Sequence, residues 1–323
     1  MRKHQKASSS EEAAGLVVYN SADASEHGNI GILASINNHN YSILFNDVVI
    51  SGLAESGEQK AILYQLAIGD NVVFEIVEGK PVLLGITVRH SMLARLRADA
   101  SRISLKGAEE HILAANVDIA IIVASTVQPP FHTRLVDRYL IMCQYGNVKP
   151  LLCLTKIDLS PMPDLSMYKD AGLPIVGVSN ETQEGISRLM PYLEGKRCIL
   201  VGNSGVGKSS LINSLLKKEL LLTKHVSEKT GKGRHTTSAS SLHLINKSTI
   251  LIDTPGIRSL GLWNVDKNTL RLYYPEFIEF AASCKFRDCT HSHEPECAVK
   301  KAVEAGLILR ERYDSYVRLL TKD

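Results

Sequence analysis

The stretch Gly202-Asn-Ser-Gly-Val-Gly-Lys-Ser209 decides the fold, because it matches the phosphate-binding pattern G-x-x-x-x-G-K-[ST]. Phosphate oxygens bind inward-pointing backbone N–H groups, and glycine lets the chain curl tightly enough to present several of them. The apolar run 198–201 before the stretch predicts a buried strand, and the apolar spacing over 211–216 predicts a helix after it. This order predicts a nucleotide site in an α/β domain.

Two residues at the end of this loop have the most specific expected roles. Lys208 is expected to neutralise charge on the β- and γ-phosphates, and Ser209 to coordinate the Mg²⁺ that accompanies the nucleotide. The helix N-terminus adds partial positive charge at the same place. The expected contact residues of this segment are Gly202, Asn203, Ser204, Gly205, Val206, Gly207, Lys208, Ser209 and Ser210.

The composition is that of an ordinary globular protein. The chain has 323 residues, of which 44% are hydrophobic and 22% charged, which suits two or three domains with real cores. No apolar run approaches the roughly 18 residues of a membrane span, and the polar N-terminus lacks a signal-peptide core. We therefore expect a cytoplasmic protein that binds no membrane.

Basic side chains gather in two segments, although the net charge of +3 is too small to indicate nucleic acid by itself. The first segment contains Arg89, His90, Arg95, Arg97, Arg102 and Lys106, and the second contains Lys217, Lys218, Lys224, Lys229, Lys232 and Arg234. Each cluster fits either a nucleic-acid contact or a solvated surface.

Residues 15–88 alternate apolar and polar side chains with period two, which predicts short strands. The three clearest sets are Tyr41, Ile43 and Phe45; Val72, Phe74 and Ile76; and Val82, Leu84 and Ile86. A hairpin turn is expected at 78–81. Strands this short and numerous favour a small antiparallel barrel, either an oligonucleotide-binding (OB) barrel or a generic β domain.

After the first basic segment, apolar runs typical of buried strands alternate with helical patterns. This alternation predicts a parallel sheet covered on both faces. Strands are expected at 117–123, 151–154, 174–178, 198–201 and 250–252, with helices over 135–142 and 186–193. The pattern becomes helical after Trp263, and the spacing of Leu309, Tyr313, Tyr316 and Leu320 gives the last helix one packed face.

Three further motifs follow predicted strands. Asp253-Thr-Pro-Gly256 is placed where Asp253 would reach Mg²⁺ and the N–H of Gly256 would sense a γ-phosphate. In Thr155-Lys-Ile-Asp158, Asp158 would accept the two N–H donors of guanine, and Lys156 would lay its stem on the base. The motif usually begins with Asn rather than Thr155. Val178-Ser-Asn180 fits a last base-contacting loop through Ser179 and Asn180.

The order of these motifs is base motif, base loop, phosphate loop and Mg²⁺ aspartate, whereas ordinary GTPases place the phosphate loop first. The chain therefore resembles a circularly permuted GTPase. In that arrangement the segment after Gly256 leads directly into the C-terminal region, so we expect nucleotide state to move a whole domain.

Cys284-x4-Cys289-x-His291-x5-Cys297 offers three thiolates and an imidazole, the ligand set of a closed structural zinc site. Such a site holds together a loop that lacks enough apolar residues to fold alone. His293 is an alternative fourth ligand that the spacing does not exclude.

The segment 230–237, Thr-Gly-Lys-Gly-Arg-His-Thr-Thr, is glycine-rich, basic and poor in apolar residues. Thr236 or Thr237 would place a hydroxyl on Mg²⁺ when GTP is bound. Ile257 stands where many small GTPases have a glutamine that positions water, so intrinsic hydrolysis should be slow. His235 is the candidate to replace that glutamine once a partner orders the segment.

The chain as a whole resembles the RsgA family of small-ribosomal-subunit-dependent GTPases. The resemblance rests on the motif order, on Gly-Arg-His-Thr-Thr at 233–237, and on the Cys/His cluster followed by Glu-Pro-Glu-Cys at 294–297. It implies a tail over 1–14, an OB-fold RNA-binding domain over 15–98, a permuted GTPase domain over 99–262 and a zinc-binding helical domain over 263–323. It also implies a monomer that binds the 30S subunit and its 16S rRNA and hydrolyses GTP with stimulation by that subunit.

Two other function classes fit the residues. An RNA-binding assembly module, in which nucleotide only tunes affinity, would not need His235. A P-loop ATPase or a metallochaperone would show no guanine preference through Asp158, or would exchange its zinc readily.

Overall fold

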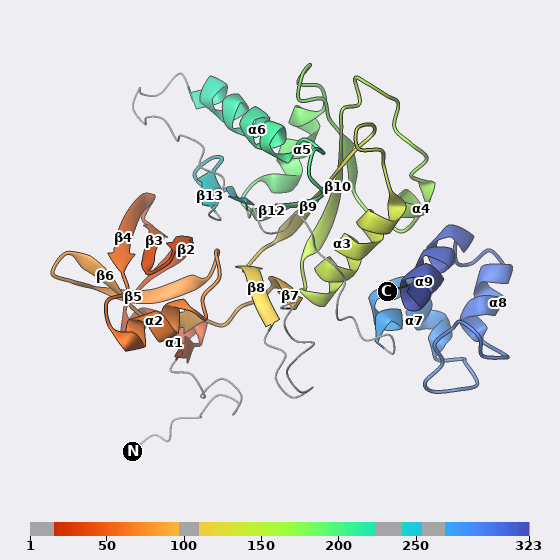
Figure 1. Cartoon of the computed structure of the whole chain (residues 1–323), viewed down its shortest axis with the longest axis horizontal. Coiled ribbons are helices and arrows are strands. Elements are labelled where there is room, and N and C mark those ends of the chain that lie inside the picture. The colour runs from red at the N-terminus through yellow and green to blue at the C-terminus, as the bar shows by residue number, and fades with distance from the viewer. Residues whose placement is uncertain (1–15, 97–109, 224–240, 254–268, 323) are drawn as a thin grey trace.

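The computed structural model describes residues 16–96, 110–223, 241–253 and 269–322, and these form three packed units in a row (Figure 1). A β unit at one end and a helical unit at the other flank a central sheet covered by helices. None of the described helices is long and apolar enough to cross a membrane.

The N-terminal unit is a sheet in the order β1-β6-β5-β2-β3-β4. Its elements are β1 (Val18–Tyr19), α1 (Ser21–His27), β2 (Asn29–Asn37), β3 (Asn40–Phe45), β4 (Val48–Leu53), α2 (Gly57–Leu63), β5 (Asn71–Val77) and β6 (Lys80–Thr87). Only β1 and β6 pair in parallel. Because β4 also contacts β6 without pairing to it, the sheet curls toward a barrel.

Side chains help to close this curl. The Tyr41 hydroxyl donates to the carbonyl of Pro81 at 2.6 Å. Gln59 of α2 donates to the carbonyl of Leu83 at 2.8 Å and accepts from its N–H at 3.1 Å. The backbone of β6 on this side is therefore satisfied by side chains and not by β4.

The alternating pattern located these strands correctly but misplaced part of the core. Leu83 is buried, whereas Val82 and Leu84 are only half-buried. Phe74 pairs with Leu83 and Val73 with Gly85, so Leu84 is an extra residue in β6. This bulge changes which residues of β6 point into the core. The predicted hairpin turn is confirmed, and its two central residues, Glu78 and Gly79, have φ of 50° and 79°.

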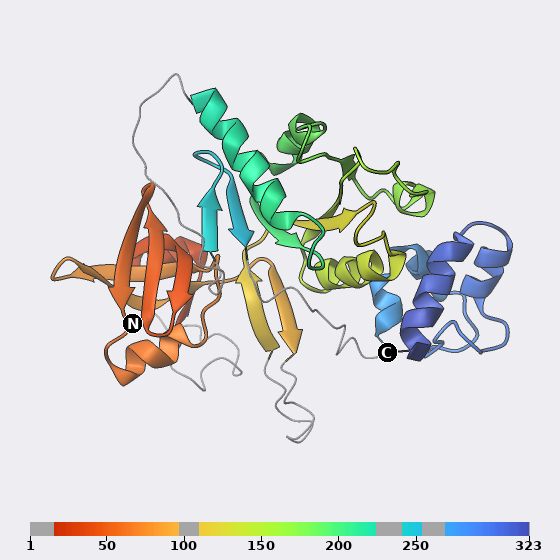
Figure 2. The ribbon, with the colours of Figure 1, turned by 45° about the horizontal axis from the view of Figure 1, so that its top comes forward.

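The central sheet has the order β11-β10-β9-β12-β14-β13. Its strands are β9 (Ile119–Ser125), β10 (Lys149–Thr155), β11 (Ile175–Gly177), β12 (Arg197–Val201), β13 (Ser241–Leu244) and β14 (Ile250–Asp253). All pair in parallel except β13, which is antiparallel to β14 at one edge. The predicted parallel sheet is confirmed, and β13 lies beside β2 of the N-terminal unit (Figure 2).

Helices cover both faces of this sheet, as predicted. Consecutive strand residues, such as Ile121 and Ile122, point into apolar cores on opposite faces of the sheet. On one face pack α3 (Thr133–Tyr145) and α4 (Ser166–Asp170), and on the other α5 (Ile186–Leu193) and α6 (Lys208–Thr223).

A two-stranded antiparallel sheet of β7 (Met92–Leu96) and β8 (Glu110–Ala115) stands between the first two units. It joins residues on both sides of the boundary expected between 98 and 99. The domain boundaries stay a prediction, but the two units share this hairpin and part of one apolar core.

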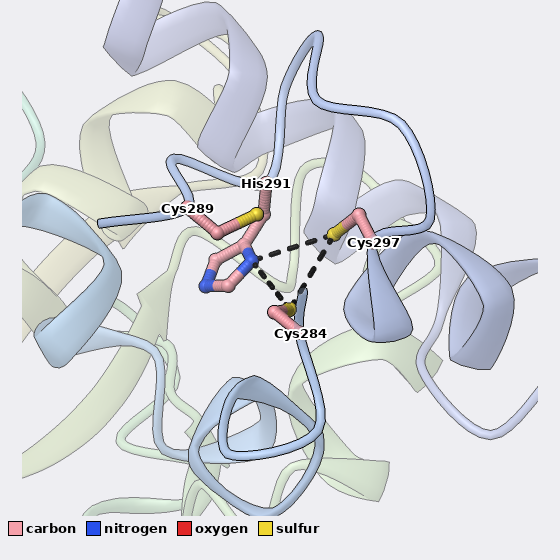
Figure 3. A group of neighbouring side chains, drawn as sticks. All are labelled: Cys284, Cys289, His291 and Cys297. Atoms are coloured by element: carbon pink, nitrogen blue, oxygen red, sulfur yellow. Dashed lines mark hydrogen bonds between the residues drawn. The ribbon is translucent and has the colours of Figure 1, made fainter. Parts of the chain in front are cut away.

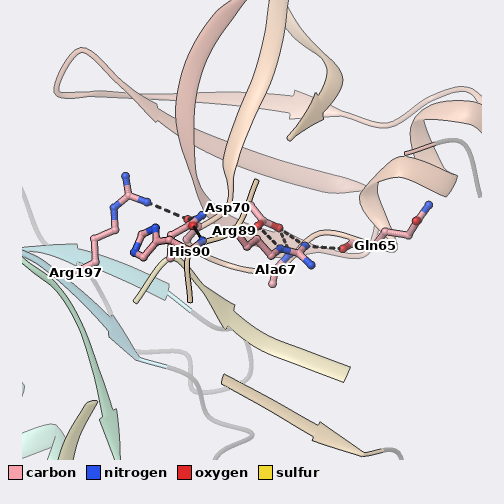
Figure 4. Close-up of polar contacts among 8 residues, drawn as sticks. Gln65, Ala67, Asp70, Arg89, His90 and Arg197 are labelled. Carbon is pink, nitrogen blue, oxygen red and sulfur yellow. Dashed lines mark hydrogen bonds and ion pairs between the residues drawn. The ribbon is translucent and has the colours of Figure 1, made fainter. Parts of the chain in front are cut away.

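Beside the hairpin lies a buried polar junction (Figure 4). The guanidinium of Arg89 donates to both carboxylate oxygens of Asp70 at 2.6 and 2.7 Å, and to the carbonyl of Gln65 at 3.0 Å. Arg197 at the start of β12 donates to the carbonyl of Gly69 at 3.2 Å. Arg89, which the sequence placed in a basic cluster, is thus committed to an internal ion pair.

The helical unit comprises η4 (Leu270–Tyr273), α7 (Pro275–Ala281), α8 (Ala298–Glu304) and α9 (Arg310–Lys322), which confirms the helical pattern predicted after Trp263. Tyr274, Phe277 and Tyr316 form its aromatic centre, with ring centroids 5.0–5.2 Å apart. Ile141 of α3 is buried in the same core, so this unit packs directly on the central one.

A second buried polar junction fixes α9 on α3. Asp137 of α3 accepts from Arg312 at 3.1 Å and from the hydroxyls of Tyr168, at 3.1 Å, and Ser315. Arg312 also donates to Glu276 at 2.7 Å. Burial raises the pKa of the Asp137 carboxyl, and its bonds to Ser315 and Arg312 counter that shift. Contacts with α3 therefore hold the helical unit.

Candidate functional site

The loops that carry the nucleotide motifs leave one edge of the central sheet. Because β9, β10, β11, β12 and β14 are parallel, their carboxyl ends meet there. The phosphate loop follows β12, the base motif follows β10, the base loop follows β11, and Asp253 ends β14. Segments far apart in the chain are thus brought to one place.

The phosphate loop has the backbone that its glycines permit. Gly202, Gly205 and Gly207 have φ of 146°, 80° and 93°. A Cβ atom on Gly202 would lie 2.2 Å from the carbonyl oxygen of Val123, so no other residue fits there. The ammonium group of Lys208 donates to the carbonyls of Gly202 at 2.7 Å and Asn203 at 2.6 Å.

Thr155 ties the base motif to the phosphate loop. Its buried hydroxyl lies 2.6 Å from the carbonyl oxygen of Val206 and 3.2 Å from that of Ala124. Lys156 donates to the carbonyls of Gly205, at 3.0 Å, and Gln128. The residue that departs from the usual Asn therefore still bridges the two loops, through its hydroxyl.

Asp158, the expected guanine reader, is exposed at the rim of this edge. In this structure, an incoming base would itself have to bury the carboxylate.

The base loop lies against the base motif and the first turns of α6. The N–H of Val178 donates to the carbonyl of Leu154 at 2.7 Å, which extends the pairing of β10 and β11. Ser179 is buried and accepts the N–H of Thr182 at 3.0 Å. The amide of Asn180 lies 3.5 Å from the carbonyl oxygen of Gly207 and accepts from Ser214 at 3.3 Å.

Four predicted site residues lie outside the described part of the chain. His235, Thr236 and Thr237 fall in 224–240, and Gly256 falls in 254–268. Asp253 is described, half-buried at the last position of β14 opposite Ser241.

The sequence reasoning missed residues that support the loops without belonging to a motif. Burial raises the pKa of Tyr139 on α3 to about 12, and a backbone hydrogen bond from Gly202 to this phenol counters that shift. Gln183 donates to Ser214 at 3.0 Å and to the carbonyl of Asn180. Neither position carried a sequence signal, because a single Tyr or Gln fits many environments.

The Cys/His cluster forms as its spacing predicted (Figure 3). The ligand atoms of Cys284, Cys289, His291 and Cys297 all lie within 4.8 Å of one another. The Nδ1 atom of His291 is 3.5 Å from the Cys284 sulfur and 3.4 Å from the Cys297 sulfur, and those two sulfurs are 3.9 Å apart. A tetrahedral centre with metal–sulfur bonds of about 2.3 Å has edges of about 3.8 Å, so the group could hold a metal ion.

The alternative ligand is not part of this group. His293 is exposed, and its Nδ1 lies 3.0 Å from the hydroxyl of Ser292. Glu294 braces the intervening loop by accepting the N–H and hydroxyl of Thr290, both at 2.7 Å, and the N–H of Ser292 at 3.1 Å.

Comparisons with known proteins agree on one family. A model of the RsgA GTPase family matches residues 86–263. The small ribosomal subunit biogenesis GTPase RsgA of Chlorobaculum parvum is 40% identical over 266 residues, covering 79% of this chain and 84% of that protein. The protein of the same name from Haemophilus influenzae, strain PittGG, is 38% identical over 267 residues, covering 80% and 75%.

Two solved structures share the arrangement of the chain. YloQ, described as a circularly permuted GTPase, is 27% identical with a TM-score of 0.68, covering 92% of this chain and 95% of that one. YjeQ from Thermotoga maritima is 28% identical with a TM-score of 0.69, covering 90% and 97%.

Proposed function

The chain belongs to the RsgA GTPase family, and on that premise we propose that it hydrolyses GTP in the late maturation of the 30S ribosomal subunit. The observation that carries the proposal is the convergence of the phosphate loop, both base-contacting loops and Asp253 at one edge of the sheet, in permuted order. The curated relatives are named for small-subunit biogenesis.

In this proposal each described loop has one task. The backbone of the phosphate loop and Lys208 bind the phosphates, while Ser209 and Asp253 hold the accompanying Mg²⁺. Asp158 accepts the donors of guanine, and Ser179 and Asn180 close the base site. The hydroxyl of Thr155 supports this arrangement by fixing the carbonyl of Val206 at 2.6 Å. Hydrolysis itself is assigned to the segment with His235, Thr236 and Thr237, together with Gly256.

We assign the metal at the Cys/His cluster as structural zinc. Three thiolates and one imidazole are a common zinc ligand set, and the sulfur–sulfur and sulfur–nitrogen distances fit its tetrahedral geometry. Cys289, His291 and Cys297 are buried, and four protein ligands would fill the tetrahedron and leave no open position for chemistry. The metal would hold the loop between α7 and α8.

The N-terminal unit is proposed to be an OB-fold. Its strands pair as a meander of β2, β3 and β4 and a hairpin of β5 and β6, with α2 placed between β4 and β5. We propose that the chain binds the 30S subunit and its 16S rRNA as a cytoplasmic monomer, with the basic segments after Leu96 and Thr223 as the phosphate-binding parts.

GTP turnover with and without purified 30S subunits tests this function. The subunits are expected to raise turnover by orders of magnitude, because a partner must order the catalytic segment. His235→Ala should abolish that stimulation and leave GTP affinity intact, with exposed His27→Ala as a matched control. If 30S subunits leave the rate unchanged, the proposal is wrong. If His235→Ala keeps full stimulation, a different residue positions the water.

Nucleotide preference tests the base site separately. Xanthine carries a carbonyl where guanine carries its amino group, so the donor amide of Asp158→Asn should bind XTP better than GTP. The control is Asp170→Asn, an exposed aspartate at the end of α4. Unchanged GTP preference in Asp158→Asn would place the base elsewhere.

A further inference from the structure

A cleft opens where the N-terminal unit meets the central sheet, and its volume is about 480 Å³. The N-terminal unit contributes β2 and the turn between β3 and β4, and the sheet contributes the start of β12 and the turn between β13 and β14. Arg197 and Ile250 are the first residues of β12 and β14. The cleft therefore lies at the amino ends of these parallel strands, opposite the nucleotide edge.

Arg197 brings an incompletely paired charge to this cleft. Its side chain is half-buried, and among the described residues its guanidinium has one hydrogen-bond partner, the neutral carbonyl of Gly69 at 3.2 Å. A second guanidinium nitrogen points away from the other labelled residues of the junction (Figure 4). Burial lowers the pKa of the guanidinium, and Asp118 and Asp70 counter that shift without forming an ion pair with it. Because a desolvated charge is stabilised by a bonded opposite charge, this site favours an anion.

A second cation lines the same cleft. Lys247, in the turn between β13 and β14, is exposed and forms no ion pair within the described part of the chain. Of the two acidic residues in the lining, Asp118 accepts the backbone N–H of Arg197 at 2.8 Å and lies 3.7 Å from the Nε2 atom of His90. Asp47 is exposed in the turn between β3 and β4. Neither carboxylate neutralises the two cations by direct contact.

Apolar side chains complete the lining of the cleft. Leu44 and Phe45 come from the N-terminal unit, and Leu244 and Ile250 come from the central sheet. Sites for small molecules combine an apolar lining with a few polar groups that fix the orientation of the ligand. The cleft has both components.

We propose that this cleft binds a small organic oxyanion, a molecule that carries one phosphate or carboxylate group on an apolar body. Arg197 and Lys247 would bind the oxyanion, and the planar guanidinium of Arg197 suits either group. Phe45 and Leu244 would contact the apolar body. Since the two cations belong to the central sheet and Phe45 to the N-terminal unit, the bound molecule would link the two units.

The charges of the lining argue against other occupants. A nucleic-acid strand would carry several phosphates along the cleft, and some of them would meet Asp47 or Asp118. A cationic molecule would be repelled by Arg197 and Lys247. A small molecule with a single oxyanion can contact the two cations without meeting either carboxylate.

The test uses full-length protein with Mg²⁺ and GDP in excess, so that the phosphate loop is already occupied. The probes are phenyl phosphate and benzoate, and the controls are neutral benzyl alcohol and cationic benzylammonium. Residue-resolved NMR of backbone amides locates binding. At least one anionic probe should give saturable shifts at Asn46 and Ser248, one on each side of the cleft, with a Kd of about 1 mM or tighter. The tighter probe identifies the preferred oxyanion, and the two controls should give no shifts there.

Matched variants place the probe in this cleft. Arg197→Met and Lys247→Met each remove one cation and should weaken binding about tenfold, because a hydrogen bond to a charged group is lost. Lys149→Met removes an exposed lysine that lines a separate cleft with His90, and it should leave the Kd unchanged. Lys247→Met keeps the test decisive if Arg197→Met disturbs the contact with Gly69. Unchanged GDP affinity verifies that each variant folds.

Three results would overturn the proposal. The first is the absence of saturable shifts with both anionic probes, and the second is equal binding of benzylammonium, which would assign the cleft to cations. The third is a loss of affinity in Lys149→Met as large as that in Lys247→Met, which would place the anion in the cleft beside His90. None of the three concerns GTP turnover, so the proposed function is judged separately.

Discussion

The two polar junctions that flank the central sheet each bury a carboxylate, but they differ in which parts of the chain the ion pair joins. At the helical junction, a fully buried carboxylate, Asp137, is neutralised by Arg312 from a distant part of the chain. At the barrel junction, Asp70 is neutralised by Arg89, 19 residues away, and Arg197 reaches only the carbonyl of Gly69. The ion pair at the helical junction therefore links two units, whereas the ion pair at the barrel junction lies within one.

This difference bears on how nucleotide state can act. The sequence led us to expect that the helical unit moves because it follows Gly256 in the chain. Its observed anchor is α3, through Asp137 and Ile141. Any movement must therefore break or carry with it a buried ion pair, which predicts a stiff connection at this end of the molecule.

Removing the metal should have the largest effect, and only on the helical side. Metal binding contributes about 10–16 kcal/mol to folding in zinc-finger peptides, and the loop with Cys284 and Cys297 has few apolar residues of its own. Chelation, or Cys284→Ser, should open the helical unit to trypsin and leave GTP affinity unchanged. Resistance of that unit after verified metal loss would show that its aromatic core suffices.

Arg312→Ala should have the second-largest effect. It should lower the free energy of unfolding by about 3–5 kcal/mol, because it leaves Asp137 buried without a counter-charge. Urea unfolding measures the loss. Arg312→Met combined with Asp137→Asn should recover most of it, since neither charge then remains. Arg310→Ala, exposed at the start of α9, is the control and should change stability by less than about 0.5 kcal/mol.

Arg89→Met should cost less, about 2 kcal/mol, because the Arg89 side chain is 19% exposed against 7% for Arg312, so water can replace part of its bonding to Asp70. Amide exchange should accelerate at Ala67 and Asp70 before it does on α9. A loss as large as that of Arg312→Ala would show that the two junctions contribute equally to stability.

Arg197→Lys should have the smallest effect, about 1 kcal/mol or less, because it keeps the charge and gives up one bond to a neutral carbonyl. Thermal unfolding of the purified variant checks it. A larger loss would make Arg197 the principal link between the barrel and the central sheet.

The sequence predicted what depends on local pattern. Strand-loop-helix order, motif order and Cys/His spacing each reside in a short stretch, and the parallel sheet and the metal-competent cluster were found where expected. It did not predict the pairing of Asp137 with Arg312, because those residues are 175 positions apart and each alone reads as an ordinary helix-surface charge.

Three other features depended on three-dimensional context. Leu84 changes which residues of β6 point into the core, because no residue of β5 pairs with it. Arg89 appeared to belong to a basic surface, but Asp70 withdraws it from solvent. Thr155 looked like a loss of bonding relative to Asn, yet its hydroxyl reaches Val206 across the sheet edge.

The order of the strands also bears on how the protein emerges from the ribosome during its own synthesis. The nascent chain delivers β9 first, adds β10 and β11 outward on one side, and then adds β12 and β14 outward on the other. Both loops proposed to contact the base are made before the phosphate loop, and Asp253 comes last. The growing polypeptide therefore cannot capture GTP in the complete pocket until translation has passed the end of β14.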